Sequence, residues 1–320
     1  MEPNKCKVCV ECITFNHAPY IVDCMNSFTV QQTKFPYVCC ILDDASSDDE
    51  PEVVRKYMQE NFNLEDESVV RIVETNDYVF WFAQHKTNKN CYFAVYFLKY
   101  NHYSIKKDNM QYIDEWHNNA KYIAYCEGDD YWTESMKLQK QYDFMEAHPE
   151  CSLCFHAYEN LLPSGEKQMR GPQLIKQVYD IKDIILAGSG FMSTNSMFFL
   201  GKLVKNNDRP DFWKNCPVGD APVKLLLAAK GLVGYIDDTM SVHRVLVPGS
   251  WTSKQQNIKN QRKHHVAILK MYDEFDAYTG YKYHKVIKKK KRKNCRVMLR
   301  REFSFLIRRM WNTIKQIKNI

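Results

Sequence analysis

Long apolar runs are missing from this chain of 320 residues. No stretch approaches the roughly 18 uncharged apolar residues that a membrane-spanning helix needs. The first residues, Met1-Glu2-Pro3-Asn4-Lys5, are polar, and the strand predicted after them is too short for the apolar segment of a signal peptide. We therefore expect a cytoplasmic protein, and the basic tail described below places it as a peripheral protein on the inner face of the membrane.

A second cysteine pair at zinc-binding spacing is also missing, although the chain has twelve cysteines. Cys6, Cys9 and Cys12 fall in one predicted strand, where a spacing of three puts consecutive side chains on opposite faces. Cys151 and Cys154 form a C-x-x-C, but the residues around them are typical of another buried strand. The pattern predicts reduced thiols in a core rather than a zinc site.

Positive charge is in deficit over most of the chain and concentrated at its end. Residues 281–320 carry 15 Lys and Arg against the single acid Glu302, whereas the other 280 residues carry 30 basic and 37 acidic side chains. After the polybasic run 288–293, apolar side chains recur at spacings of three and four, at Leu299, Phe303, Leu306, Met310, Ile314 and Ile317. This pattern predicts a basic amphipathic helix, for which an anionic membrane surface, nucleic acid and another part of the protein are the possible partners. We favour the membrane surface and expect no nucleic acid partner.

Strands and helices alternate along the rest of the chain, which predicts an α/β protein with a mostly parallel, Rossmann-like sheet flanked by helices. The predicted strands are 6–13, 37–42, 69–74, 122–126, 151–158, 192–200, 232–236 and 240–245. The predicted helices are 21–32, one beginning near Pro51, 91–100, 135–147, 180–186 and 220–229. Residues 75–119 mix aromatic and polar side chains without one period, and we interpret 91–100 as a mostly buried helix between loops.

Two of the predicted strands end in acidic residues. Asp43-Asp44 follows the strand 37–42, and Glu127-Gly128-Asp129-Asp130 follows the strand 122–126. Ligands of open α/β sheets bind at the carboxyl ends of strands, so the two acidic segments can meet at one site. Carboxylates that lie close together repel unless a cation lies between them, and oxygen ligands suit Mg²⁺ or Mn²⁺ bound to nucleotide phosphates. The interpretation as simple helix caps or solvated turns stays open for each segment taken alone.

At these residues the chain resembles family 2 glycosyltransferases, the inverting, nucleotide-sugar-dependent enzymes of the GT-A fold. The segments that carry the resemblance are Thr14-Phe15-Asn16, Asp43-Asp44-Ala45-Ser46-Ser47-Asp48, Glu127-Gly128-Asp129-Asp130-Tyr131-Trp132, Val218-Gly219-Asp220, His243-Arg244 and Gly249-Ser250-Trp251. The resemblance covers roughly residues 8–251. It implies a glycosyltransferase domain at 1–255, with a nucleotide-binding half at about 1–132 and an acceptor half at about 133–255, followed by a helical extension at 256–320.

The resemblance also implies a role for each segment. Asp129 would bind a Mn²⁺ or Mg²⁺ ion, and Asp220 would be the general base. The nucleotide sugar, most often a UDP-sugar in this family, would contact Thr14, Phe15, Asn16, Asp43, Asp44, Glu127, Asp130 and Arg244. The acceptor, a glycan or lipid-linked hydroxyl of cell-surface polysaccharide synthesis, would lie near Trp132, Asn195 and Trp251.

Two residues depart from the usual pattern of the family, and two other classes of function stay open. Glu127 stands where the family usually has Asp, and Leu246 stands where His is frequent. These departures leave room for a glycan-binding relative without turnover. A sugar-phosphate nucleotidyltransferase shares the layered α/β core. It would need a Gly-rich phosphate-binding loop after the first strand, and Thr14-Phe15-Asn16-His17 contains no glycine.

Overall fold

The computed structural model of the chain describes residues 6–188, 190–204 and 209–318, with side chains given for all of these except 251, 308, 309 and 312–318. The chain forms two compact units. Unit 1 comprises Met1–Asp180, Gly188–Arg209 and Lys230–Val245, and unit 2 comprises Ile181–Ala187, Pro210–Ala229 and Leu246–Ile320. The borders of these units differ from the predicted domain boundary at residue 255. That domain boundary stays a prediction.

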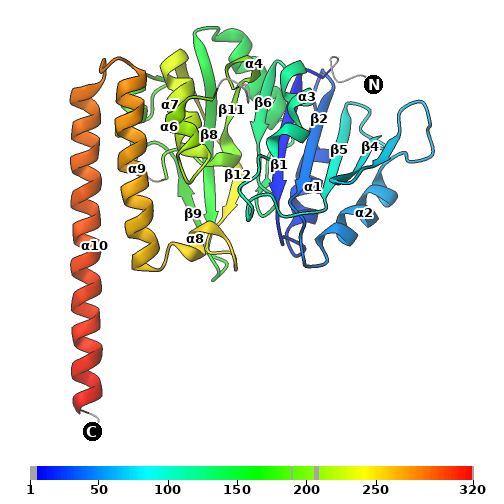
Figure 1. Cartoon of the computed structure of the whole chain (residues 1–320). Coiled ribbons are helices and arrows are strands. Elements are labelled where there is room, and N and C mark those ends of the chain that lie inside the picture. Colours follow the sequence, from blue (N-terminus) through cyan, green and yellow to red (C-terminus); the bar gives the residue numbers. More distant parts are fainter. Residues whose placement is uncertain (1–5, 189, 205–208, 319–320) are drawn as a thin grey trace. The chain divides into compact units, whose positions relative to one another are not determined.

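Unit 1 is built on one mixed sheet (Figure 1). Its parallel centre consists of β6 (Tyr122–Tyr125), β1 (Val8–Thr14), β2 (Tyr37–Asp43) and β5 (Cys91–Leu98), in that order. Beyond β5 lie the antiparallel β4 (Tyr78–Gln84) and β3 (Arg71–Glu74). Beyond β6 lie β11 (Phe198–Leu200), β8 (Cys151–Leu161), β12 (Leu232–Arg244) and β10 (Val178–Tyr179), while β7 (Tyr131–Trp132) pairs with β12 and β9 (Lys167–Arg170) with β8.

Alternate residues of the central strands pack on opposite faces of the sheet, because strand side chains have a period of two. Val8, Val10 and Cys12 belong to the core shared with α1 (Ile21–Thr29), α2 (Glu50–Asn61) and α4 (Lys137–Ala147). Cys9 and Cys40 belong to the opposite core, with the 3-10 turn Met110–Tyr112 and α3 (Asp114–Asn119). Ten of the twelve cysteines are buried free thiols, so the prediction of core cysteines is confirmed.

The prediction of a helix at 91–100 is wrong, because these residues form the strand β5. β5 lies between β2 and β4, and all eight of its side chains are buried. A strand covered on both faces loses the alternation of apolar and polar residues that identifies an exposed strand. The predicted strand 69–74 exists as β3 but runs antiparallel to β4, which was missed, since the short turn between them leaves no room for a crossover.

Two strand predictions in the second half also need correction. Within 192–200 only Phe198–Leu200 is a strand, and Thr194–Ser196 is a 3-10 turn. The two strands predicted at 232–236 and 240–245 are one continuous strand, β12, with irregular register against β8 between Ile236 and Ser241. Such an irregularity interrupts the alternation of apolar and polar residues along the strand, but it does not end the strand.

The elements assigned to unit 2 are helical: α5 (Ile181–Leu186), α6 (Asp211–Lys214), α7 (Asp220–Lys230), α8 (Trp251–Lys254), α9 (Ile258–Tyr278) and α10 (His284–Lys318). α9 and α10 form a hairpin, in which the buried Asp276 bonds His284 at 2.6 Å between Oδ2 and Nδ1. At the other end of the hairpin Arg262 Nε donates to Glu302 Oε1 at 2.6 Å. None of the described helices combines the length and the apolar character that a membrane span requires.

Candidate active site

The loop after β1 and the turn after β2 are joined by one buried carboxylate, that of Glu50 at the start of α2. Glu50 accepts hydrogen bonds from the Thr14 hydroxyl and from the backbone N–H of His17, the latter at 2.7 Å. The Ser46 hydroxyl lies 2.9 Å from the same carboxylate. Since parallel strands bring their carboxyl ends together, with Thr14 opposite Asp43 in the register, a single side chain can fix both loops.

Asn16 makes the second connection between these loops. Its backbone lies in the left-handed region, at φ 58°, which Asn tolerates better than most residues. Its backbone N–H donates to Ser46 Oγ, and its side-chain Oδ1 accepts from the backbone N–H of Ser47, both at 2.8 Å. Within the predicted Thr14-Phe15-Asn16 segment, Thr14 is buried and Phe15 is exposed, so Phe15 offers the most accessible surface.

Asp43 and Asp44 are both buried, and their oxygens serve the protein itself. Asp43 Oδ1 accepts from the backbone N–H of Ser46 at 3.0 Å, and burial raises the pKa of Asp43 to about 7. The two oxygens of Asp44 accept from the backbone N–H groups of His102 and Tyr103, at 2.8 and 3.0 Å. The turn after β2 thus uses its acids to hold backbone, here and in the loop 101–103.

The acidic segment after β6 is fixed by its glycine. A Cβ atom added to Gly128 would lie 2.1 Å from Thr14 Oγ1 and 2.6 Å from Thr14 Cβ, far inside contact distance. The Gly128 N–H donates to Ile13 O at 3.2 Å, and Cys24 Sγ donates to Glu127 O at 3.6 Å. Only a residue without a side chain lets this segment lie so close to the loop after β1.

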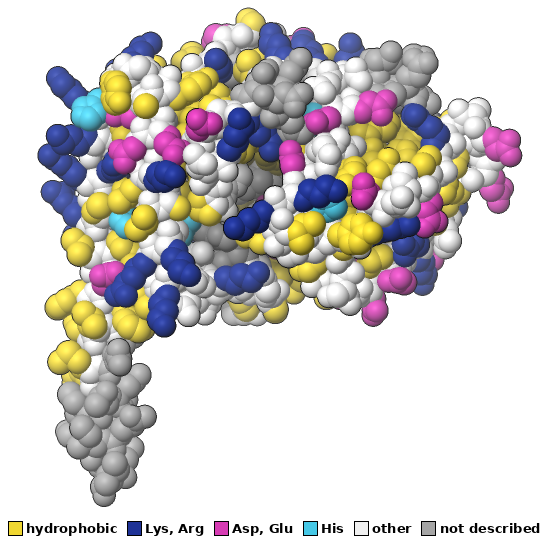
Figure 2. Space-filling view, in the orientation of Figure 1, with side chains coloured by type: hydrophobic (Ala, Val, Ile, Leu, Met, Phe, Trp, Pro, Cys, Tyr) yellow, Lys and Arg dark blue, Asp and Glu magenta, His cyan; other side chains and the backbone are white. Residues whose placement is uncertain are grey.

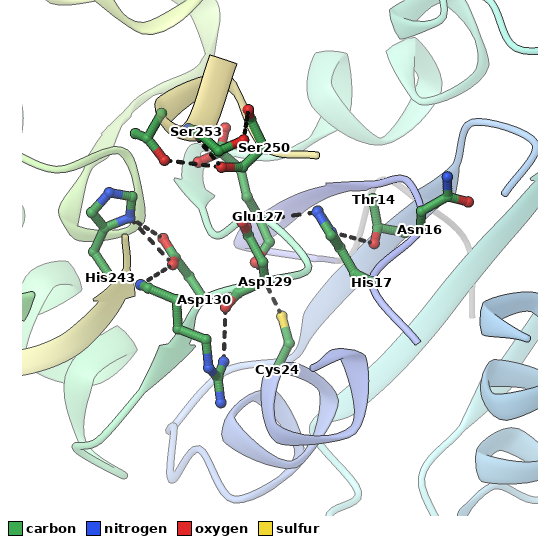
Figure 3. A network of polar contacts seen from close by, with 12 residues as sticks. Thr14, Asn16, His17, Cys24, Glu127, Asp129, Asp130, His243, Ser250 and Ser253 are labelled. Carbon is green, nitrogen blue, oxygen red and sulfur yellow. Dashed lines mark hydrogen bonds and ion pairs between the residues drawn. The ribbon is translucent and has the colours of Figure 1, made fainter. Parts of the chain in front are cut away.

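Asp130 is almost fully buried and fully engaged (Figure 3). Its Oδ1 accepts from the backbone N–H of Arg244 at 2.8 Å, and its Oδ2 accepts from Asn195 Nδ2 at 3.0 Å. His243 Nδ1 lies 3.0 Å from Oδ2. Although burial alone would lower the pKa of His243, the charge of Asp130 outweighs it and raises the pKa to about 9. His243 is therefore protonated at neutral pH and pairs with Asp130.

Asp129 differs from its neighbour, because its carboxylate remains partly exposed. The His17 imidazole lies 3.8 Å away, between Oδ2 and Nε2, and forms an ion pair with Asp129 when it is protonated. Burial, followed by the charge of Asp130, raises the pKa of Asp129, which means that its ionised form is short of positive charge. A divalent cation would supply that charge, so the residues present fit a metal at Asp129.

The rest of a metal's coordination would come from outside the protein. Within 6–188, 190–204 and 209–318, no three His, Cys, Asp or Glu side chains cluster closely enough to bind a metal by themselves. Mg²⁺ and Mn²⁺ are commonly held by one or two carboxylates together with substrate phosphates and water, and Asp129 with the exposed Glu127 matches that kind of site.

Arg244 supplies positive charge next to this segment. Its Nη1 donates to the backbone oxygen of Asp129 at 2.8 Å, and its Nη2 pairs with the Asp23 carboxylate. The guanidinium also lies over the rings of Tyr131 and Tyr20, at 4.6 and 5.2 Å from their centres. These contacts hold the Arg244 guanidinium at the carboxyl end of the sheet. In the acidic segment it bonds a backbone oxygen, and the carboxylate that it pairs with is that of Asp23.

Comparison with known proteins finds a family match for the region that contains the loop after β1 and the turn after β2. The sequence from 9 to 78 matches the family model described as Glycosyl transferase family 2. This region belongs to that family. The predicted resemblance is therefore confirmed, and the family 2 region includes Thr14, Asn16, Asp43, Asp44 and Glu50.

Two curated relatives are known as uncharacterized proteins, Rv1520 of Mycobacterium tuberculosis and Mb1547 of Mycobacterium bovis. Each is 28% identical to this chain over 245 residues, which are 75% of this chain and 59% of the relative. The chain therefore spans less than two thirds of the length of these relatives.

Among solved structures, the mannosyltransferase PcManGT from Pyrobaculum calidifontis, in complex with GDP-Man and Mn²⁺, superposes with a TM-score of 0.50 at 12% identity, over 85% of this chain and 65% of that one. S. aureus TarS 1-349 gives a TM-score of 0.46 at 14% identity, over 87% of this chain and 72% of that one. The likeness to PcManGT shows a shared fold, and the predicted GT-A-type α/β architecture is confirmed.

Two residues predicted for an acceptor pocket of the family 2 fold lie in the core instead. Asn195 is fully buried, and its amide is occupied by Asp130, Val242 O, Ser193 and Ser241. Trp132 is buried against Phe28 and donates from Nε1 to Asn195 O at 3.0 Å. Asn195 thus positions Asp130, and Trp132 supports Asn195. The side chain of Trp251, the third such residue, lies outside the described ones.

Asp220, the predicted general base, begins α7 in unit 2, whereas Asp129 belongs to unit 1. Burial would raise the pKa of Asp220, but the Lys224 ammonium, 2.6 Å from its Oδ2, lowers the pKa below its ordinary value. Asp220 is therefore ionised at neutral pH, the form that a base requires. Its role in the same site as Asp129 stays a prediction.

Sequence reasoning missed two residues of the family 2 region, Glu50 and His17. Glu50 precedes Pro51 at a helix start, where an acid is usually explained as a favourable charge in the first turn. His17 follows the predicted Thr14-Phe15-Asn16 segment, and its Nδ1 lies 3.0 Å from Thr14 Oγ1. Because the Thr14 proton goes to Glu50, His17 Nδ1 is the donor here, which leaves Nε2 facing Asp129.

Proposed function

We propose that this chain is an inverting, divalent-metal-dependent glycosyltransferase that moves a sugar from a nucleoside diphosphate to a hydroxyl of a glycan or lipid-linked acceptor. The observation that carries the proposal is the contrast within the acidic segment: Asp130 is buried and satisfied, whereas Asp129 is partly exposed and its charge is poorly compensated, with His17 3.8 Å away. That segment touches the family 2 region at Thr14. A carboxylate in this state is suited to a metal-bound diphosphate.

The donor would bind at the carboxyl ends of β1, β2 and β6. Phe15 would contact the nucleoside, and the loops fixed by Glu50 would form its walls. Mn²⁺ or Mg²⁺ held by Asp129, with Glu127 beside it, would neutralise charge on the diphosphate as it leaves. Arg244 would add a fixed positive charge, oriented by Tyr131 and Asp23.

Transfer would proceed by a single displacement. The acceptor hydroxyl oxygen forms a bond to the anomeric carbon while the bond from that carbon to the phosphate oxygen breaks, and the nucleoside diphosphate leaves with the electron pair. Asp220, ionised beside Lys224, accepts the hydroxyl proton. Attack from the face opposite the leaving group inverts the anomeric configuration. The acceptor class, a growing cell-surface polysaccharide, is part of the same proposal.

A thermal-shift panel of UDP-sugars and GDP-mannose, with and without Mn²⁺, tests donor binding, because a ligand of the native state raises the melting temperature. We expect one donor class to raise it, and more strongly with Mn²⁺. In Asp129→Asn the Mn²⁺-dependent part should vanish, while the matched surface variant Glu67→Gln, exposed and outside the site, should keep it.

Turnover and stereochemistry need their own measurement. Proton NMR of the anomeric signal during transfer or hydrolysis of the donor should show product of the opposite configuration, and Asp220→Asn should lower the transfer rate at least about 100-fold. Retention of configuration would refute the displacement. Absence of turnover with every donor, together with binding of glycans, would favour a binding protein instead.

A further inference from the structure

The exposed face of α10 has an unusual sequence of side chains along its length. Residues three or four positions apart share one face of a helix. On one face these positions are basic from 285 to 296 and apolar from 299 to 310. We call this face the α10 stripe; it consists of Lys285, Lys288, Lys289, Arg292, Arg296, Leu299, Phe303, Leu306 and Met310, all exposed.

The opposite face of α10 packs within unit 2. Ile287 and Met298 are buried there, and the Lys290 ammonium donates to the backbone oxygen of Ala187, just after α5. Lys291 pairs with Asp273 of α9, and Glu302 pairs with Arg262. The helix is therefore held from one side, and the side chains of the stripe remain exposed.

The basic part of the stripe borders a groove of about 720 Å³. Its lining residues are Leu186, Lys285, Lys288, Lys289, Arg292, Lys293 and Arg296. Six of these seven side chains are basic. Nearby, burial lowers the pKa of Lys290 to about 8, and the charge of Lys293 adds to that shift. Such a groove favours anions, and several phosphates at once would satisfy it better than a single ion.

The apolar part of the stripe continues directly from the basic part. Leu299, Phe303, Leu306 and Met310 are each more than half exposed, and Trp311 beside them is exposed as well. In Figure 2 hydrophobic side chains gather on the lower described part of this helix. A soluble surface seldom exposes so many large apolar side chains in one row unless something covers them.

We propose that the α10 stripe docks on an anionic phospholipid bilayer. The lipid phosphates occupy the basic groove, and the apolar residues enter the boundary between headgroups and acyl chains. Nucleic acid offers the phosphates but no apolar layer to cover the row from Leu299 to Met310. A bilayer offers both, in the order in which the stripe presents them.

Co-sedimentation of the full chain with vesicles tests this inference. We expect binding to phosphatidylcholine vesicles that contain phosphatidylglycerol to exceed binding to pure phosphatidylcholine vesicles at least 10-fold, and to weaken as NaCl is raised. The double variant Phe303→Ser/Leu306→Ser should lower the partition coefficient at least 10-fold, and Lys288→Gln/Arg292→Gln should do so for anionic vesicles.

Matched variants on α9 serve as controls. Val266→Ser removes another exposed apolar side chain, and Lys259→Gln/Lys263→Gln removes two other exposed charges, so each should change binding less than 2-fold. Far-ultraviolet circular dichroism and the melting temperature verify that every variant is folded. The proposal is overturned if the stripe variants bind vesicles like the unaltered chain, or if the chain binds a 20-nucleotide RNA or a DNA duplex but no vesicle. Donor turnover is measured separately, so failure here leaves the proposed transferase activity untouched.

Discussion

The turn after β2 and the segment after β6 have nearly the same sequence character, an apolar strand followed by acidic residues, but the structure uses their acids differently. Asp44 is closed off by two backbone N–H groups of the loop 101–103. Asp129 keeps a partly exposed carboxylate whose charge is poorly compensated. The difference teaches that an acidic strand end can bind a ligand only where its carboxylate oxygens are not already occupied by hydrogen-bond donors of the protein.

The largest expected effect separates Asp129 from Asp44 by activity. Asp129→Asn should lower the transfer rate at least about 100-fold, because it removes the charged ligand that we propose for the diphosphate-bound metal. Its melting temperature should stay the same or rise, since the variant relieves repulsion with Asp130. Donor turnover and thermal unfolding, measured on the same preparations, check both parts. Activity within 10-fold of the unaltered chain would remove Asp129 from the site.

The next effect concerns the contact between the segment after β6 and the loop after β1. Gly128→Ala should destabilise the native state by about 3 kcal/mol, because its methyl group would overlap Thr14. Urea unfolding measures the change. Gly188→Ala is the matched control, since a Cβ there meets nothing within 4 Å, and it should change stability by less than about 1 kcal/mol. Equal stability of both variants would show that the two segments move apart freely.

Asp44→Asn should lower the free energy of unfolding by about 2 kcal/mol and should not act directly on the transfer reaction. An amide can accept from only one of the two backbone N–H groups, so its own NH₂ would face the other donor. Chemical denaturation measures the loss, and hydrogen exchange should locate it at His102 and Tyr103. Asp49→Asn is the control, because Asp49 is exposed in the same turn and its side chain caps nothing. If Asp44→Asn were as stable as this control, the interpretation that Asp44 holds the backbone of the loop 101–103 would be wrong.

The smallest effect is a pH dependence at the anchor of the segment after β6. The pKa of His243 is about 9 when folded and near 6.5 when unfolded, so its pairing with Asp130 stabilises fully below pH 6.5 and is lost as the pH rises through about 9. Compared with His243→Gln, the unaltered chain should be more stable by about 1–2 kcal/mol at pH 6, with the difference fading above pH 9. Denaturation curves at several pH values check this, and a difference that grows with pH would contradict it.

How far the sequence leads depends on which contacts make each feature. Local patterns were sufficient to place both acidic segments at strand ends, because strand ends and turns follow from nearby residues, whereas His243-Arg244 was singled out by the family resemblance. They failed at β5, where burial on both faces removes the alternation, and at Asn195, whose partner Asp130 is 65 positions away in the chain. Glu50 was missed for the same reason, since its donors come from two loops. Long-range hydrogen bonds leave no periodic trace in a sequence.

Glu50 has a further consequence for ligand recognition. Because one buried carboxylate binds both the loop after β1 and the turn after β2, neither loop can shift without breaking bonds in the other. A nucleoside would therefore meet a preorganised cradle and lose little affinity to ordering it. Recognition of this kind works by lock-and-key fit, which favours discrimination between bases over adaptation to many.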